Sequence, residues 1–261
     1  MAHIARQSRV TSHRSTSPLK LWVPRRPGAA AWIYATTFGG GLVSGDSVHV
    51  DMELGPNTTT VFTTQSSTKV FRTLEDHECS QQLHARVENG ALLAVAPDPL
   101  VCYRGAVYRQ HNQIHLEPQA NLVHIDWLTS GRAARGERWQ FQQLKTRLEV
   151  YRDRRLLLVD SLSLLPNEME MTNPLRMGTH HCLASVVLLG ERLAEEAASL
   201  HAEVAEEELD VETCCESVSR KAEGIIWRLV GPSTQAVGEC LRRRLAFLKT
   251  FLEETPWERK W

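Results

Sequence analysis

A glycine-rich loop and a polar, basic segment are the parts of this sequence best suited to handle an ion or a partner. Residues 38–46 read FGGGLVSGD, with four glycines in seven positions and Asp46 at the end. Glycine gives the backbone access to positive φ and lets another chain approach closely. Residues 63–72 read TTQSSTKVFR, which is too polar for an ordinary core strand and ends in Lys69 and Arg72.

The glycine loop does not match known nucleotide-binding loops. A P-loop ends in Gly-Lys followed by Ser or Thr, whereas Asp46 and Ser47 follow Gly45. A dinucleotide-binding loop lies between a strand and a helix, and here the alternating residues after Asp46 predict a strand. A crowded turn that leads into a strand explains the glycines equally well.

Nucleophilic catalysis is not supported either. Ser66 and Lys69 have the Ser-x-x-Lys spacing in which a lysine activates a serine. That chemistry requires the start of a helix, but the Thr, Val and Phe residues around Lys69 favour a strand. Residues three apart on a strand point to opposite faces, so we reject this assignment.

Alternating apolar and polar residues from position 46 to about 165 predict half-buried antiparallel strands. Turn sequences at 54–58, 87–91 and 116–120 each separate such a strand from a second β segment, at offsets of 33 and 29 residues. This recurrence is typical of stacked hairpin-like coils. A β-sandwich with evenly spaced hairpins explains the periodicity equally well.

Only the last third of the chain has helical periodicity. One apolar stripe consists of Leu193, Ala197, Leu200 and Val204. A second helix is predicted to begin at Pro232, to carry its apolar stripe from Val237 to Leu252, and to end before Pro256. No linker divides the chain, so we predict a single domain over residues 1–261 with a helical C-terminal part at 191–254.

Bulk composition is that of a soluble globular protein. Hydrophobic residues make up 42%, and the net charge of −1 gives no general attraction to nucleic acid. No apolar run approaches the roughly 20 residues needed to cross a bilayer. The six irregularly spaced cysteines favour reduced thiols in the cytoplasm. Residues 1–17 are basic and serine-rich, which predicts a flexible N-terminus, with a transit peptide as the alternative.

The two segments described first resemble the UreD family of urease accessory proteins, called UreH in some bacteria. The family pattern is GGGLVGGD followed by TTQxxTKxYR, and this chain reads GGGLVSGD at 39–46 and TTQSSTKVFR at 63–72. The likeness continues at 97–99, 105–106, 127–137, 227–231 and 258–261. It implies a layered, helix-like β stack. We therefore expect a mainly β fold of stacked antiparallel layers with two α-helices near the C-terminus.

The resemblance also implies a function. Family members are non-enzymatic scaffolds and chaperones that deliver nickel to urease, in a complex with UreF, with the GTPase UreG through UreF, and with apo-urease. Neither nucleic acid nor a membrane is involved. We expect no tightly bound cofactor and only transient nickel, and GTP hydrolysis belongs to UreG. The alternative is a β-solenoid enzyme acting on a small polar substrate at the surface formed by 39–46 and 63–72.

The candidate residues fall into three groups. The family motifs indicate a functional surface of Gly39, Gly40, Gly41, Gly45, Asp46, Thr63, Thr64, Gln65, Thr68, Lys69, Arg72, Pro97, Asp98, Pro99, Gly131, Arg132, Gly136 and Glu137. Loosely held nickel would need oxygen ligands along a wet path, for which the candidates are Asp46, Asp51, Asp98, Asp126 and Glu137. The apolar C-terminal tail indicates a partner-binding surface of Leu248, Phe251, Leu252, Trp257 and Trp261. We also expect Arg132 to form an ion pair with Glu137 or Asp98.

Overall fold

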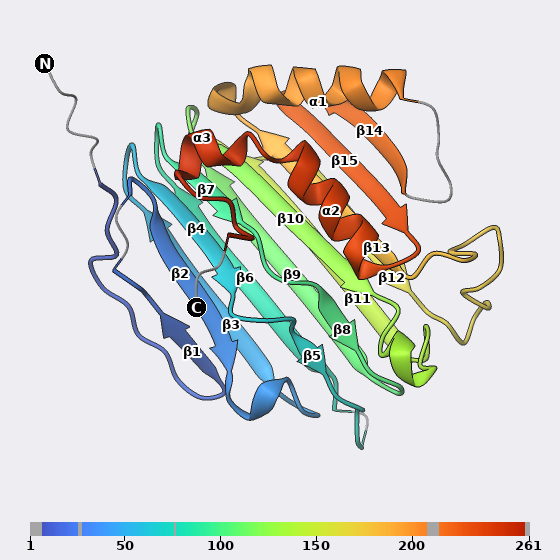
Figure 1. Ribbon diagram of the computed structural model, residues 1–261. Coiled ribbons are helices and arrows are strands. Elements are labelled where there is room, and N and C mark those ends of the chain that lie inside the picture. Colours follow the sequence, from blue (N-terminus) through green and yellow to red (C-terminus); the bar gives the residue numbers. More distant parts are fainter. Residues whose placement is uncertain (1–6, 26–27, 76, 208–213, 259–261) are drawn as a thin grey trace, which may run out of the picture.

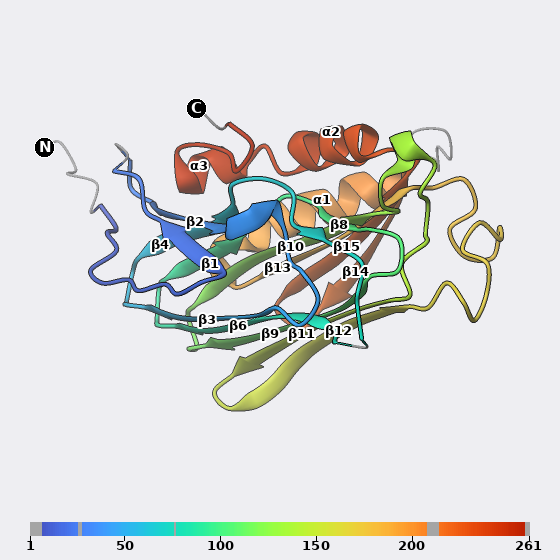
Figure 2. The ribbon, with the colours of Figure 1, turned by 90° about the horizontal axis from the view of Figure 1, so that it is seen from below.

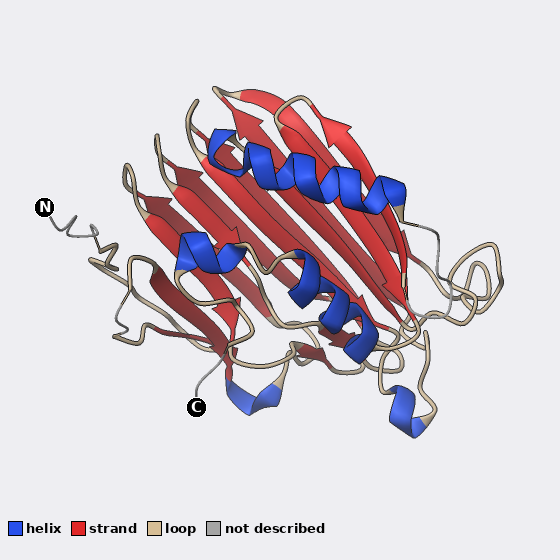
Figure 3. Cartoon of the chain, turned by 45° about the horizontal axis from the view of Figure 1, so that its top comes forward, coloured by secondary structure: helices blue, strands red, loops and turns tan. Residues whose placement is uncertain are grey.

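The computed structural model describes residues 7–25, 28–75, 77–207 and 214–258, which form three layers (Figure 1, Figure 2). Within these residues the strands make a ten-stranded and a five-stranded sheet that face each other. Helices cover the outer face of the ten-stranded sheet (Figure 3). The mainly β, stacked architecture with helices near the C-terminus is therefore confirmed.

The ten-stranded sheet is the middle layer. Its main path, in spatial order, is β1 (Leu19–Trp22), β2 (Ala31–Thr37), β4 (Thr59–Thr64), β7 (Leu92–Val95), β10 (Asn121–Thr129), β13 (Cys182–Leu189), β15 (Gly224–Gly231) and β14 (Cys215–Lys221). Two short strands, β5 (Lys69–Val70) and β8 (Leu100–Cys102), pair beside this path. The five-stranded sheet has the order β12 (Arg155–Leu164), β11 (Gln143–Arg152), β9 (Val107–Leu116), β6 (Cys79–Val87) and β3 (Ser47–Leu54).

Three successive coils account for the recurring turns in the sequence. Each coil crosses from a strand of the five-stranded sheet, through a tight turn, to a strand of the ten-stranded sheet, giving β3–β4, β6–β7 and β9–β10. Val48 pairs with Gln81 and Thr59 with Leu92, both 33 positions later. Gln81 pairs with Gln110, 29 positions later. The offsets in the sequence are therefore the pairing registers between successive coils of the stack. They do not arise from evenly spaced hairpins of a β-sandwich.

The turns of neighbouring coils touch, which explains their residue types. Asn57 donates its backbone N–H to the carbonyl of Asn89 (3.0 Å), and Gln119 donates to the Asn89 side chain (3.0 Å). Gly90 has φ +70°, and a Cβ there would lie 2.2 Å from Asn57 Oδ1. Only glycine meets both conditions without strain, so this turn must carry it for the coils to stack.

The predicted antiparallel pairing holds for the strands before and after the coils but not between the coils. The pairs β1–β2, β10–β13, β13–β15, β14–β15 and β11–β12 are antiparallel. The pairs β2–β4, β4–β7, β7–β10, β3–β6, β6–β9 and β9–β11 are parallel, because each coil repeats the direction of the one before. Alternation along a strand reports which face is buried and carries no information on the direction of the neighbouring strand.

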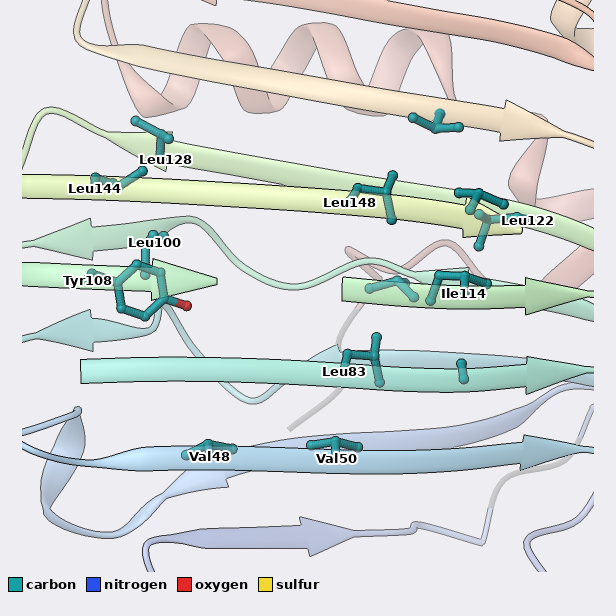
Figure 4. Packing of buried hydrophobic residues seen from close by; sticks show 14 of the residues in the cluster. Val48, Val50, Leu83, Leu100, Tyr108, Ile114, Leu122, Leu128, Leu144 and Leu148 are labelled. Atoms are coloured by element: carbon teal, nitrogen blue, oxygen red, sulfur yellow. The ribbon is translucent and has the colours of Figure 1, made fainter. Parts of the chain in front are cut away.

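Two apolar cores hold the layers together. The core between the sheets contains inward-facing residues such as Val48, Leu83, Ile114, Leu122 and Leu144 (Figure 4). The second core lies between the ten-stranded sheet and the helices. Inner strands of the middle layer, such as β7 and β10, are therefore buried on both faces. The described part of the chain contains no helix long and apolar enough to span a membrane.

The C-terminal part is less helical than predicted. α1 (Ala194–Glu206), preceded by the 3₁₀ turn η3 (Glu191–Leu193), buries the expected stripe at Leu193, Ala197 and Leu200. The predicted helical part at 191–254 also contains β14 and β15. β15 lies between two other strands with much of its length buried, so its apolar run gives no clear alternation.

The second predicted helix is divided into α2 (Thr234–Arg244) and α3 (Leu248–Leu252). The Ser233 side chain caps α2 by accepting the Ala236 N–H (3.1 Å). Between the helices, Leu248 and Lys249 donate to carbonyls three residues back, which tightens the backbone relative to an α-helix. This interruption keeps both Leu248 and Leu252 on the sheet.

The N-terminal segment predicted to be flexible spans residues 1–17, of which 1–6 lie outside the described residues. Residues 7–17 form no helix or strand. Ser8 nevertheless attaches this segment to the sheet, because its N–H donates to the carbonyl of Ala29 (2.8 Å) and its hydroxyl accepts the Thr59 N–H (2.9 Å).

Candidate functional site: the motif loops and an interior polar row

The predicted functional segments gather at one end of the stack. They lie in the loops that return from the ten-stranded to the five-stranded sheet, at 38–46, 65–75 with 77–78, 96–106 and 130–142, along the lower edge of Figure 1. This end includes the 3₁₀ turns η1 (Phe38–Gly40) and η2 (Ala133–Arg135). Leu42 bridges to Val70, and Lys69 pairs with Val101, so successive loops are stacked as the strands are.

The glycine loop packs closely against the next loop. A Cβ on Gly41 would lie 2.6 Å from the Lys69 carbonyl oxygen and 2.8 Å from the Phe71 ring. Asp46 closes the turn, because its carboxylate accepts the Val43 N–H (2.8 Å). The crowded-turn interpretation thus accounts for Gly41 and for one bond of Asp46. A role of Asp46 in activation stays a prediction.

The hydroxyl-rich segment bonds to the neighbouring coil. Thr63 donates its hydroxyl to the carbonyl of Ala96 (2.6 Å), and the Thr64 hydroxyl accepts the Asp98 N–H (2.8 Å). The carbonyl of Pro97 accepts the indole N–H of Trp127 (2.8 Å). These motif residues therefore position the loop that carries Asp98. Lys69 and Arg72 are exposed beside it.

The expected ion pair forms between Arg132 and Glu137. Arg132 Nε lies 2.8 Å from Glu137 Oε2, Nη2 contacts Oε1, and the guanidinium lies 4.2 Å above the Tyr103 ring. The hydrogen bond from Arg132 lowers the pKa of the Glu137 carboxyl. This carboxylate therefore serves to fix the 130–142 loop, and it is not among the residues that line the interior cavities described next.

Two adjoining cavities lie between the sheets, and they bring two of the predicted nickel ligands together. The first has a volume of about 80 Å³ and is lined by Thr64, Thr68, Asp98, His124 and Asp126, among others. The second has a volume of about 180 Å³ and shares His124 and Asp126 with the first. Asp98 and Asp126 thus belong to one interior region, whereas Asp46, Asp51 and Glu137 do not line it.

A row of polar side chains runs through these cavities. We call it the interior polar row and define it as Gln110, Asn112, His124, Asp126, Asp160 and Ser185. Gln110 Nε2 donates to Asp126 (3.0 Å), and the Asn112 side chain bonds to His124 Nε2 (3.0 Å). Ser185 donates to Asp160 (2.7 Å), which also accepts from Arg228 (2.6 Å). The row therefore reaches from β9 and β10 to β12 and β13.

Burial shifts the pKa values of the two central groups in opposite senses. Burial raises the pKa of the Asp126 carboxyl to about 6, although the bond from Gln110 opposes the shift. Burial lowers the pKa of His124 to about 4, opposed by the Asp160 charge. At pH 7 the histidine is neutral and the aspartate is mostly ionised, so the row offers an imidazole and carboxylates. Within the described ranges, no three His, Cys, Asp or Glu side chains are arranged to hold a metal ion.

Asp126 and His124 should give opposite pH dependences of stability. The raised pKa of Asp126 means that the folded state binds more protons than the unfolded state between about pH 4 and 6. The contribution of Asp126 to the free energy of unfolding therefore falls as pH rises. The lowered pKa of His124 means that the unfolded state binds more protons up to about pH 6.5, so this contribution rises with pH.

Replacing Asp126 with Asn removes the first contribution and keeps an acceptor for Gln110. The free energy of unfolding of the variant, relative to the wild type, should increase by about 2 kcal/mol between pH 4 and pH 7. Urea titrations of both proteins across this range measure the difference. A difference that does not change with pH would mean that Asp126 is hydrated and has an ordinary pKa.

Sequence reasoning missed most of this row, although a signal was present. In β10 the inward positions are Leu122, His124, Asp126 and Leu128, so two polar residues interrupt an apolar face. Gln110 and Asn112 interrupt β9 between Tyr108 and Ile114 in the same way. Only the stacking of β9 against β10 shows that these interruptions meet.

The tail residues predicted to bind a partner lie largely in the protein's own core. Leu248 and Leu252 are 0% and 1% exposed, and Phe251 and Trp257 are half-buried against the same cluster. Trp261 lies outside the described residues. Among the described tail residues, Leu248 and Leu252 therefore cover the ten-stranded sheet instead of forming an exposed surface, and a partner contact of Phe251 and Trp257 stays a prediction.

Comparison with known proteins identifies the class to which this stack belongs. The family model described as "UreD urease accessory protein" matches residues 1–261. A urease accessory protein UreD of Sorangium cellulosum is 40% identical over 94% of this chain and 77% of its own length. One from Anaeromyxobacter is 36% identical over 99% and 87%, and urease accessory protein D of Arabidopsis thaliana is 34% identical over 96% and 95%. The chain belongs to the UreD family of urease accessory proteins.

Proposed function

We propose that this protein is a non-enzymatic scaffold and chaperone that delivers nickel during maturation of the urease active site. Family membership supports the role in urease maturation, and the interior polar row supports the delivery of an ion. The observation that carries the proposal is the meeting of two cavities at His124 and Asp126 inside a sheet-on-sheet core. Such a core is normally filled with apolar side chains, since buried polar groups must be satisfied.

The chemistry of the row suits a nickel ion in passage. Ni²⁺ accepts imidazole and carboxylate ligands, and Asp98, Asp126 and Asp160 lie along the two cavities with His124 between them. The cavities have room for several water molecules, so a partly hydrated ion can exchange water for one or two protein ligands at a time. Nickel is here the cargo, and loosely placed oxygen ligands favour its release.

We further propose that the protein acts in the cytoplasm in a complex with UreF, with UreG through UreF, and with apo-urease. The alternative of an enzyme at the surface formed by 39–46 and 63–72 has less support. Asp46, Thr63 and Thr64 are engaged with backbone groups of their own or a neighbouring loop, as a scaffold requires.

The proposal is tested by producing apo-urease with UreF and UreG, in the presence and absence of this chain. With the chain, we expect it to co-purify with urease and the nickel content to approach full occupancy. Without it, nickel content and urease activity should fall together. Equal nickel loading in both preparations would contradict the proposal, as would a chain that binds neither urease nor UreF.

A further inference from the structure

The free edge of β12 has the properties of a strand that pairs with another strand. β12 is ten residues long and lies at the end of the five-stranded sheet, where β11 is its ladder partner among the described residues. A strand at this position presents a row of backbone N–H and C=O groups that can extend the sheet. The hairpin of β11 and β12 forms the outer margin of its layer in Figure 2.

The opposite edge of the same sheet provides an internal comparison. The outward positions of β3 carry His49, Asp51 and Glu53, all exposed. Charged side chains on an edge strand discourage pairing with another chain. The outward positions of β12 instead carry Leu156, Val159, Ser161 and Ser163, none of which is ionisable.

Exposed apolar side chains also occur along β12 and in the segment that follows it, as they do at Trp22 and in the motif loops. Leu156 is 53% exposed and Val159 39%. In the segment that leaves the strand, Met169 is 47% and Leu175 92% exposed. Large apolar side chains this exposed gain most from being covered by a partner.

The charged residue near the centre of the strand does not oppose pairing. Asp160 points inward, and its carboxylate accepts from Ser185 (2.7 Å) and Arg228 (2.6 Å) of the ten-stranded sheet. An incoming strand therefore would not bury an unpaired charge at this position. It would instead cover Leu162 and Leu164, which are only partly buried at the edge of the core.

From these observations we propose that the β12 edge pairs with the β12 edge of a second copy of this chain. Two copies related by a two-fold axis place the same strand antiparallel to itself, which is the simplest closed arrangement. Like charges directly opposite each other destabilise a strand pair. In the register that places Val159 opposite Val159, Asp160 lies opposite Leu158 and Arg155 opposite Ser163, so like charges do not meet. Pairing of β3 with itself at Asp51 would place two aspartates opposite each other.

The oligomeric state of the purified full chain tests this proposal. We expect sedimentation equilibrium to show a dimer with a dissociation constant of roughly tens of micromolar, as expected for a small interface. Val159→Lys places a charge on the free edge and should weaken the dimer at least tenfold. Gln82→Lys adds the same charge to an exposed position on the same face of β6, away from the edge, and should leave the dimer unchanged.

Hydrogen exchange provides a second measurement. Amides of β12 should exchange faster when the protein is diluted below the dimer's dissociation constant, while those of β9 in the middle of the sheet should not change. A wild-type protein that is monomeric at all concentrations would overturn the proposal. A dimer that both lysine variants weaken equally would also overturn it. So would a monomer whose Val159→Lys variant loses UreF binding, because the edge would then pair with a strand of another protein.

Discussion

Replacing Glu216 with Ala should lower the free energy of unfolding by about 3 kcal/mol or more, because it breaks a buried group of charges that joins the helical layer to the sheet. Glu216 lies in β14, with its side chain 10% exposed. It accepts from Arg244 Nε (3.2 Å), Trp227 Nε1 (3.0 Å) and the thiol of Cys240 (3.2 Å). The substitution leaves the donors of Trp227 and Cys240 without this acceptor, and leaves Arg244 with only the half-exposed carboxylates of Glu203 and Glu207.

Arg244 is the other essential member of this group. Its side chain is 7% exposed, and it also contacts Glu203 (2.9 Å) and Glu207 at and just beyond the end of α1. One guanidinium thus connects α2, α1 and β14. Removing one member of a buried ion pair is costly chiefly because the remaining charge is left in a poorly hydrated site.

Urea unfolding of the variant and the wild type measures the loss, with Glu239→Ala as the matched control. Glu239 is exposed on α2 and bonds to Gln235 within the same helix, so its removal should cost no more than about 0.5 kcal/mol. The double variant Glu216→Ala with Arg244→Met should be less destabilised than the sum of the single variants, since neither charge remains. A cost for Glu216→Ala no larger than that of the control would mean that water satisfies these groups.

The comparison of sequence and structure shows which features are encoded locally. The turns at 54–58, 87–91 and 116–120 could be found because their residues are restricted by backbone conformation, and their spacing equals the register of the parallel pairs. The direction of neighbouring strands could not be found, because it depends on how the chain returns between sheets. β15 was missed because a strand inside a covered sheet loses the alternation that identifies half-buried ones. β14 was missed because it is an edge strand without a buried residue, so it has no apolar face to show.

The candidate site follows the same division. Asp98 and Asp126 were identified as possible ligands from their residue type and family resemblance, but their common cavity depends on contacts between β4, β7 and β10. Leu248 and Leu252 were assigned to a partner because sequence near a chain end gives no measure of burial. Apolar side chains suit an interface or a core equally well, and in the structure both leucines pack in the core against the ten-stranded sheet.

The Asp126→Asn variant should lower nickel loading of co-produced urease at least tenfold while the scaffold stays folded and bound to its partners. This result rests on the proposed function. Asp126 is the acidic residue that lines both cavities, so its carboxylate is the ligand that an ion would meet when passing from one to the other. Asparagine keeps the size and the bond to Gln110 but removes the charge that attracts a divalent cation.

One control variant and one second cavity variant make the measurement specific to the interior cavities. Asp51→Asn makes the same chemical change on the outer face of the five-stranded sheet, where the side chain is 68% exposed, and should leave nickel loading unchanged. Asp98→Asn changes the other aspartate of the first cavity and should reduce loading as Asp126→Asn does. Nickel per urease active site is measured by metal analysis, and complex formation by co-purification. If Asp126→Asn and Asp51→Asn load urease equally while the complex forms normally, nickel does not pass through this row, and the protein acts on urease by binding alone.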